Sequence, residues 1–179
     1  CGADLVHLAR RANQSGLKVP FSTYYAASDG NTAAIGAGGV DRIRLVGESP
    51  AYNPEPATKD MAAYITAYKK LYPNGDINQP RIQTGLQMLA NAIRQAKTTD
   101  VYKVALALEG MEYTTLSGDH VVMRRSDHQL QMPIYISVHS NKNIKFDFDN
   151  SGFGLVTESK VERDKASLTT TCRMERPGA

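Results

Sequence analysis

The sequence predicts an α/β fold in which helices are layered against a sheet. Segments that alternate polar with apolar residues, as half-buried strands do, are separated by segments whose apolar residues recur every three or four positions, as on one helical face. The chain has 179 residues, of which 41% are hydrophobic, so it can bury a substantial core. No internal repeat or low-complexity tract interrupts the alternation. This pattern favours an α/β fold over a helical bundle or a β-sandwich.

The first part of the chain predicts one helix and two strands. Residues 4–15 place apolar side chains on one helical face, and Gly16 follows as a C-terminal stop. A strand, a short helical turn in a glycine-rich stretch, a second strand and a proline-rich loop are expected next. These four segments are residues 18–25, 32–36, 41–46 and 49–56.

The middle of the chain predicts three helices. Thr58 stands where an N-cap residue is favoured, and residues 59–72 carry an i, i+3, i+4 apolar stripe that ends before Pro73. Residues 82–97 repeat this periodicity, and residues 101–108 form a shorter helical segment.

The last part of the chain predicts four strands, the first two of them joined by a polar turn that contains Asp127. The expected strands are residues 120–124, 133–140, 144–148 and 155–161.

The charge distribution argues against nucleic-acid binding. The net charge of +3 comes from basic residues that are interleaved with acidic ones, and no block of five like charges occurs. Phosphate backbones are bound by clustered cations. No apolar run approaches the ~20 residues that a membrane-spanning helix needs.

The sequence contains no motif for catalysis, a cofactor or a metal. No Gly-x-Ser-x-Gly elbow, P-loop or Cys-x-x-Cys spacing is present, and the four histidines fall at surface or core positions. Cys1 and Cys172 could form one disulfide, and two unpaired thiols are an equally open alternative. We therefore expect no enzyme activity, and we expect a truncated chain because helical periodicity begins at once without a signal peptide.

Several segments, taken together in this order, resemble a known family. The clearest are Ala-Leu-Glu-Gly-Met and, some fifteen residues later, the polar turn, proline and alternating strand Ser-Asp-His-Gln-Leu-Gln-Met-Pro-Ile-Tyr-Ile-Ser-Val. The chain is similar to the C-terminal half of periplasmic substrate-binding proteins of ABC transporters, of the branched-chain amino-acid (leucine/isoleucine/valine-binding) type. The segments that carry the resemblance are residues 17–21, 63–73, 107–111, 126–138 and 171–177.

This resemblance implies the periplasmic binding protein type I architecture, in which two α/β lobes close like a Venus flytrap over a ligand. It assigns residues 1–78 to part of the C-terminal lobe, residues 79–133 to a return into the N-terminal lobe, and residues 134–179 to a crossing back with the tail. The N-terminal half of the protein would be missing. Helices in the returning segment would then expose apolar surface unless another chain covers them.

The resemblance also points to ligand-binding residues at the ends of strands. Thr23, Tyr24 and Tyr25 stand where amino-acid binders commonly place an acid, but residues 22–26 contain none. Tyrosines offer aromatic walls and hydroxyl donors, which suit an aromatic or apolar carboxylate. Strand alternation could instead put one tyrosine in the core, and either tyrosine could face the ligand.

Two charged residues complete the candidate site. Glu48 could supply the missing negative charge from the next loop, or it could be a solvated rim residue. Arg81 lies where the chain would pass between lobes, and its guanidinium could hold a ligand carboxylate or pair with a nearby acid. Gln83 is a weaker polar candidate.

The function implied by the resemblance is solute capture in the periplasm for an ABC permease. The ligand would be a branched-chain amino acid or a related small carboxylate, including an aromatic acid. A ligand-sensing receptor domain of the same fold, without transport, is the alternative.

Overall fold

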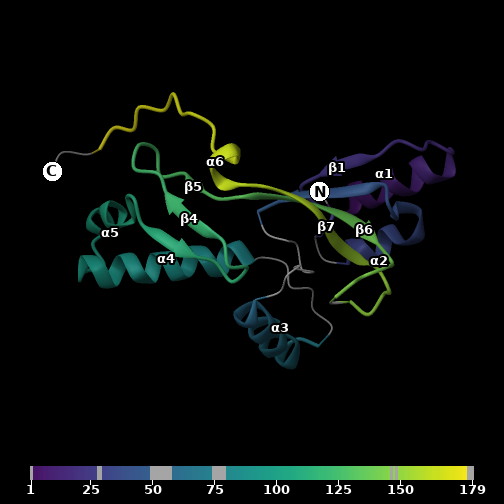
Figure 1. The fold of residues 1–179 in the computed structure, drawn as a ribbon, viewed down its shortest axis with the longest axis horizontal. Helices are drawn as coiled ribbons and strands as arrows, with labels where there is room; N and C mark the ends of the chain where they lie inside the picture. Colours follow the sequence, from purple (N-terminus) through teal and green to yellow (C-terminus); the bar gives the residue numbers. More distant parts are fainter. Residues whose placement is uncertain are drawn as a thin grey trace.

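The computed structural model describes residues 2–27, 30–48, 58–73, 80–145, 147 and 149–176. The molecule is elongated, with helices and strands gathered into two halves (Figure 1). One half contains a four-stranded sheet with strand order β1-β2-β6-β7, and the other contains a three-stranded sheet with order β3-β4-β5. We call these the large-sheet half and the small-sheet half.

The large sheet mixes parallel and antiparallel pairs. β1 (Phe21–Thr23) runs parallel to β2 (Ile43–Gly47), and β2 pairs antiparallel with β6 (Ile134–Ser140). β7 (Gly154–Val161) pairs antiparallel with β6. β6 and β7 run from the centre of the molecule into the large-sheet half (Figure 1).

Helices cover the large sheet and close its core. α1 (Gly2–Gln14) carries the apolar face expected from the sequence, and it lies against α2 (Asn31–Ile35) and the 3₁₀ turn η1 (Gly36–Gly39). Burial of aliphatic side chains is the main favourable term in such a core. The buried cluster consists of Leu5, Val6, Ala9, Ala26, Ile35, Ile43, Leu45 and Leu155.

The small-sheet half is built from two helices and three short strands. α4 (Pro80–Ala96) packs against α5 (Val101–Leu108), which begins where the Asp100 carboxylate accepts a hydrogen bond from the Lys103 amide at 3.0 Å. β4 lies between its two antiparallel neighbours. The strands are β3 (Glu112–Thr114), β4 (His120–Met123) and β5 (Leu130–Gln131).

α3 (Lys59–Leu71) contacts the turn between β3 and β4. Thr58 caps the helix as expected, because its hydroxyl oxygen accepts a hydrogen bond from the Met61 amide at 3.0 Å. The same hydroxyl donates to the Leu116 carbonyl, and Leu116 packs on the buried pair Met61 and Ile65.

One predicted strand is wrong. Within residues 144–148, the described residues Ile144, Lys145 and Asp147 are not in a strand. β6 and β7 pair directly with each other as a hairpin, and these three residues lie in the turn that joins them. In this turn the Asp147 carboxylate accepts hydrogen bonds from the amides of Ser151 and Gly152.

α4 leaves an apolar stripe uncovered on its outer side. Ile82, Leu86 and Leu89 recur at helical spacing and are 54%, 62% and 42% exposed. Met88 and Ala92, on the opposite side, are buried. α4 therefore presents exposed apolar side chains within residues 79–133.

The C-terminal tail returns to the small-sheet half. After β7 and the short helix α6 (Arg163–Ala166), the chain runs past the β4–β5 hairpin (Figure 1). The Arg124 guanidinium donates to the Leu168 carbonyl at 2.6 Å, and Arg176 donates to the Arg125 carbonyl at 2.7 Å. β6, β7 and the tail therefore connect the two halves.

Candidate functional site

The carboxyl ends of β1 and β2 lie at the same edge of the large sheet. These strands are parallel, and Thr23 pairs in register with Leu45, two residues before Gly47. Loops at the carboxyl ends of parallel strands form the usual ligand-binding edge of an α/β sheet. Thr23 therefore lies at the edge from which Glu48 also projects.

Local hydrogen bonds fix the loop that carries the two tyrosines. The Thr23 hydroxyl oxygen accepts from the Tyr25 amide at 3.1 Å, and the amide group of buried Asn31 donates to the Tyr25 carbonyl at 2.8 Å. β1 ends at Thr23, so strand alternation does not extend to the tyrosines. Tyr24 is 76% exposed and Tyr25 47% exposed, and neither side chain enters the core.

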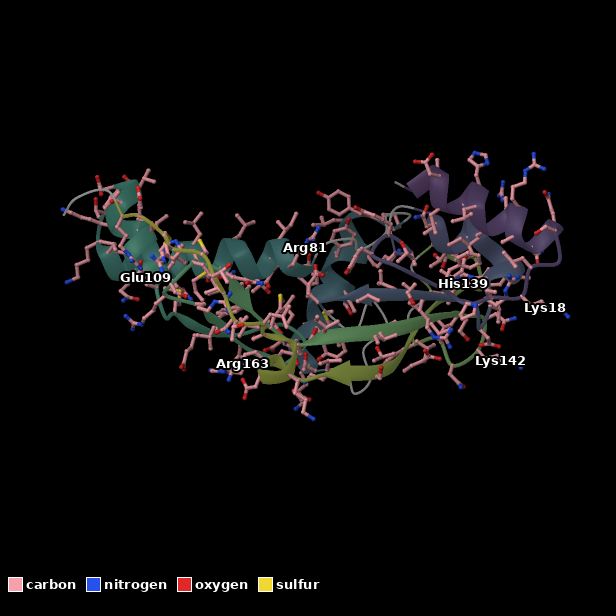
Figure 2. All side chains as sticks on the ribbon, turned by 90° about the horizontal axis from the view of Figure 1, so that it is seen from above. Lys18, Arg81, Glu109, His139, Lys142 and Arg163 are labelled. Carbon is pink, nitrogen blue, oxygen red and sulfur yellow. The ribbon has the colours of Figure 1, made fainter. Side chains whose placement is uncertain are left out.

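Glu48 and Arg81 form an ion pair with each other. Arg81 Nε lies 3.3 Å from Glu48 Oε1, and the two side chains are 60% and 34% exposed respectively. Arg81 is in the first turn of α4 and Glu48 follows β2, so the pair joins the two halves near the middle of the molecule (Figure 2). The structure thus brings together two of the residues selected from the sequence.

Gln83 lies two residues after Arg81 on α4, but its side chain is partly buried whereas that of Arg81 is exposed. Its side-chain oxygen is buried and accepts no hydrogen bond within the described part of the chain. Thr84, its neighbour on α4, is also buried. Buried polar atoms are normally paired, so the side-chain oxygen of Gln83 is one of the exceptions among the described residues.

A buried charged network lies at the junction of the halves, and sequence reasoning did not identify it. The Tyr135 hydroxyl lies 2.7 Å from both carboxylate oxygens of Asp119, and Lys160 Nζ lies 2.9 Å from Asp119 Oδ1. Burial, and then the hydrogen bond to Asp119, raises the pKa of the Tyr135 hydroxyl. Burial opposes protonation of Lys160, but its bonds to Asp119 and Glu162 raise its pKa in net.

This network forms one wall of a polar hollow. Arg163, at the start of α6, donates to the ring of His120 at 3.1 Å and lies in the middle of the molecule (Figure 2). Acids and bases alternate around the hollow, so it has no single sign of charge to select an anion or a cation. Its lining includes Gly118, Asp119, His120, Pro133, Lys160 and Arg163.

The polar turn that contains Asp127, at the start of the segment of residues 126–138, is held by ion pairs. Arg124 binds Asp127 through two contacts, Nε–Oδ1 at 2.8 Å and Nη2–Oδ2 at 2.5 Å. These bonds from Arg124 are the main cause of the low pKa of the Asp127 carboxyl. His128 has a positive φ of 55° and contacts Glu109 at 3.1 Å. The turn therefore has a structural arrangement rather than a catalytic one.

Glu109 also holds the tail, at the far end of the small-sheet half (Figure 2). Arg176 Nε donates to Glu109 Oε1 at 2.8 Å, and this bond, followed by the one from His128, lowers the pKa of Glu109.

His139 is a buried histidine in the large-sheet half. It is 0% exposed, its Nε2 lies 2.9 Å from the Gly36 carbonyl, and its ring stacks on Phe153 at a centroid distance of 5.5 Å. Nδ1 has no partner within the described residues. Burial lowers the pKa of the imidazole. The side chain is therefore part of the core.

Across the described ranges, no group of three or more His, Cys, Asp or Glu side chains is arranged to hold a metal ion. None of the described helices combines the length and apolar character needed to cross a membrane. Cys172 is exposed, and Cys1 lies outside the described residues.

The family comparison decides the identity of the fold. The family model described as "Periplasmic binding protein" matches residues 1–142. The chain belongs to the periplasmic binding protein family. A Leu/Ile/Val-binding protein homolog 4 from Brucella melitensis is 31% identical to this periplasmic binding protein over 98% of the chain and 42% of its own length. The Brucella abortus protein of the same name matches equally. The chain thus spans less than half the length of these curated relatives.

Solved structures agree with the family assignment. A leucine-, isoleucine-, valine-, threonine- and alanine-binding protein from Brucella ovis, in a closed conformation, superposes with a TM-score of 0.80 at 25% identity, over 97% of this chain and 45% of its own. A solute-binding protein from Rhodopseudomonas palustris BisB5, in complex with 3,4-dihydroxybenzoic acid, has a TM-score of 0.67 at 14% identity, over 88% of this chain and 42% of its own. The type I periplasmic binding protein fold expected from the sequence is confirmed, as part of a longer two-lobe architecture.

Proposed function

We propose that this chain is part of the solute-binding component of an ABC uptake transporter and acts in the periplasm without enzyme activity. Family members are substrate-binding proteins, and the Brucella relatives are named for leucine, isoleucine and valine. In this proposal, residues 1–78 contribute to the C-terminal lobe and residues 79–133 to the N-terminal lobe. Residues 134–179 cross back, and the missing N-terminal half completes the cleft.

The observation that carries the proposal is the pair of exposed tyrosines at the carboxyl edge of β1. Asn31 and Thr23 hold their loop in place, so Tyr24 and Tyr25 are available to a ligand without rearrangement of the core. Aromatic side chains bury large apolar areas and have few rotatable bonds, which suits them to lining a binding cleft.

We propose a small carboxylate as the ligand, either a branched-chain amino acid or an aromatic acid. Residues 22–26 contain no acid for an ammonium group, and Glu48 is already paired with Arg81. An aromatic acid needs no ammonium partner, and the same fold binds 3,4-dihydroxybenzoic acid in the Rhodopseudomonas palustris protein. Arg81 could pair with the ligand carboxylate if Glu48 is displaced.

Titration calorimetry tests this proposal. The chain, combined with a polypeptide that supplies the N-terminal half, is titrated with leucine, valine and 4-hydroxybenzoate. The titrations are repeated with the variants Tyr24→Ala and Tyr25→Ala. We expect binding of at least one of these carboxylates, weakened about tenfold or more by a tyrosine substitution, which corresponds to about 1.4 kcal/mol. Tyr72→Ala, at an exposed tyrosine beyond α3, is the matched control and should bind as the parent does. If all three substitutions change the affinity equally, Tyr24 and Tyr25 are not part of the ligand-binding site.

A further inference from the structure

One buried side chain of α2 fixes the loop that carries Tyr24 and Tyr25. Asn31, the first residue of α2, is 4% exposed, and its amide group donates to the Tyr25 carbonyl at 2.8 Å. A buried hydrogen bond of this kind holds its two partners in one arrangement for as long as both backbones stay in place. The position of the loop therefore depends on the position of the first turn of α2.

The same end of α2 is bound by the segment that joins β6 to β7. The Thr32 hydroxyl donates to Asp149 Oδ2 at 3.0 Å, and Thr32 follows Asn31 directly. α2 has only five residues, and its N-cap residue is Gly30, which has no side chain to cap the helix. Isolated helices this short are not stable in water, so α2 depends on such tertiary contacts.

Asp149 divides its two carboxylate oxygens between its own segment and α2. Oδ1 accepts from the Ser151 amide at 3.2 Å, and Oδ2 accepts from Thr32. Burial opposes ionisation of Asp149, but the hydrogen bonds from Ser151 and Thr32 lower its pKa in net. Hydrogen bonds to a charged acceptor are stronger than those to a neutral one, so this bond is suited to hold α2 in place.

The β6–β7 hairpin also binds the other end of α2. The Nε2 atom of His139, in β6, lies 2.9 Å from the carbonyl of Gly36, which follows α2, and the His139 ring stacks on Phe153. α2 lies close to β7 (Figure 1). The hairpin thus holds α2 at both ends, and the bond between Thr32 and Asp149 is at the end that carries Asn31.

We propose that Asp149 is a positioning residue for the ligand-binding loop of residues 23–25 and acts through Thr32 and Asn31. This role rests on the proposed function, whereas the position of the loop does not. When the bond between Asp149 and Thr32 is lost, the loop spends less time in the arrangement that presents Tyr24 and Tyr25. The apparent affinity for a ligand falls with that fraction. In this proposal Asp149 itself does not contact the ligand.

Two single substitutions break this bond from opposite sides. Thr32→Val removes the hydroxyl and keeps the branched shape of the side chain, and Asp149→Ala removes the acceptor. Thr32→Ser keeps a hydroxyl and should behave as the parent does. Thr66→Val is the matched control, because the Thr66 hydroxyl donates to the Ala62 carbonyl within α3.

Each variant is combined with the polypeptide that supplies the N-terminal half, and two quantities are measured. Hydrogen exchange of the amides of residues 23–27 is followed by mass spectrometry without ligand. Calorimetry then gives the affinity for leucine, valine and 4-hydroxybenzoate. We expect Thr32→Val and Asp149→Ala each to speed the exchange, and to weaken binding, by about three- to tenfold, the range of one net hydrogen bond. The double variant should show no further change, because both substitutions remove the same bond.

Parental exchange of residues 23–27 in Thr32→Val, or full additivity in the double variant, would overturn the proposal. A parent that binds one of the three carboxylates, with single variants that bind it equally well, would also overturn it. If the parent binds none of them, the proposed function fails, and the exchange rates alone decide whether Asp149 positions the loop. If Asp149→Ala does not melt cooperatively, the comparison of Thr32→Val with Thr32→Ser decides.

Discussion

The hydroxyl of Tyr135 lies 2.7 Å from both carboxylate oxygens of Asp119, although Tyr135 is in β6 of the large sheet and Asp119 is in the turn before β4 of the small sheet. Asp119 is 7% exposed and Tyr135 is also 7% exposed, so this hydrogen bond is shielded from water. Lys160 supplies the positive charge that a buried carboxylate needs. The turn before β4 is thereby attached to β6 and β7 at the junction of the halves.

Removal of that hydroxyl should destabilise the chain. Tyr135→Phe leaves the Asp119 carboxylate with one fewer donor, and hydrogen bonds to charged groups contribute roughly 1.5–3 kcal/mol. We expect the free energy of unfolding, measured by urea denaturation, to fall by about that amount. Tyr24→Phe changes an exposed tyrosine in the same way and should have no such effect. Similar losses in both variants would show that the bond to Asp119 is not the cause.

Two glycine-to-alanine substitutions should have opposite effects. A Cβ at Gly39 would lie 2.1 Å from Ile35 Cγ2 and 3.2 Å from the His139 ring, so Gly39→Ala should cost about 1–3 kcal/mol of stability. A Cβ at Gly85, within α4, meets nothing within 4 Å. Gly85→Ala should therefore add roughly 0.5–1 kcal/mol through its higher helix propensity. Thermal unfolding of both variants against the parent tests this, and stabilisation by Gly39→Ala would contradict the described packing.

The stability of the chain should fall as the pH drops through the range in which histidine titrates. Burial lowers the pKa of folded His139, whereas in the unfolded chain it takes up a proton near pH 6.5. The unfolded state then binds more protons, so the contribution of His139 to stability is present above about pH 6.5 and is lost progressively below it. His139→Gln should reduce this slope between pH 7.5 and 5, measured by urea denaturation. His7→Gln, at an exposed histidine, should retain it, and an unchanged slope in His139→Gln would disprove the assignment.

The ion pair between Glu48 and Arg81 should contribute little to folding. Both side chains are partly exposed, and such pairs are worth about 0.2–1 kcal/mol and weaken with salt. A double-mutant cycle with Glu48→Gln and Arg81→Gln should give a coupling energy in that range for unfolding. A coupling energy of several kcal/mol would mean that the ion pair is desolvated and structural. That result would argue against the proposal that Arg81 leaves Glu48 to bind a ligand carboxylate.

Most helices and the main strands could be predicted because their patterns are local. The stripe of residues 59–72 and the cap at Thr58 depend on residues within one or two helical turns, and they correspond to α3. The short strands β3 and β5 were missed because two or three residues are too few to display alternation. Residues 144–148 alternate like a strand, but their described members Ile144, Lys145 and Asp147 are not in a strand and lie between the paired strands β6 and β7.

The site was only partly predictable for the same physical reason. Tyr24, Tyr25 and Glu48 follow strands, and position after a strand can be inferred from sequence. The pairing of Glu48 with Arg81, and of Asp119 with Tyr135 and Lys160, depends on how distant elements pack. No spacing in the sequence indicates those contacts.

Native mass spectrometry of the purified protein, followed by identification of any small molecule released on denaturation, tests the central claim most directly. The solute-binding proposal predicts that the folded material carries an amino acid or aromatic acid, together with a second polypeptide that supplies the missing lobe. A folded chain that is alone, free of ligand and unchanged in mass on addition of leucine, valine or 4-hydroxybenzoate would contradict it.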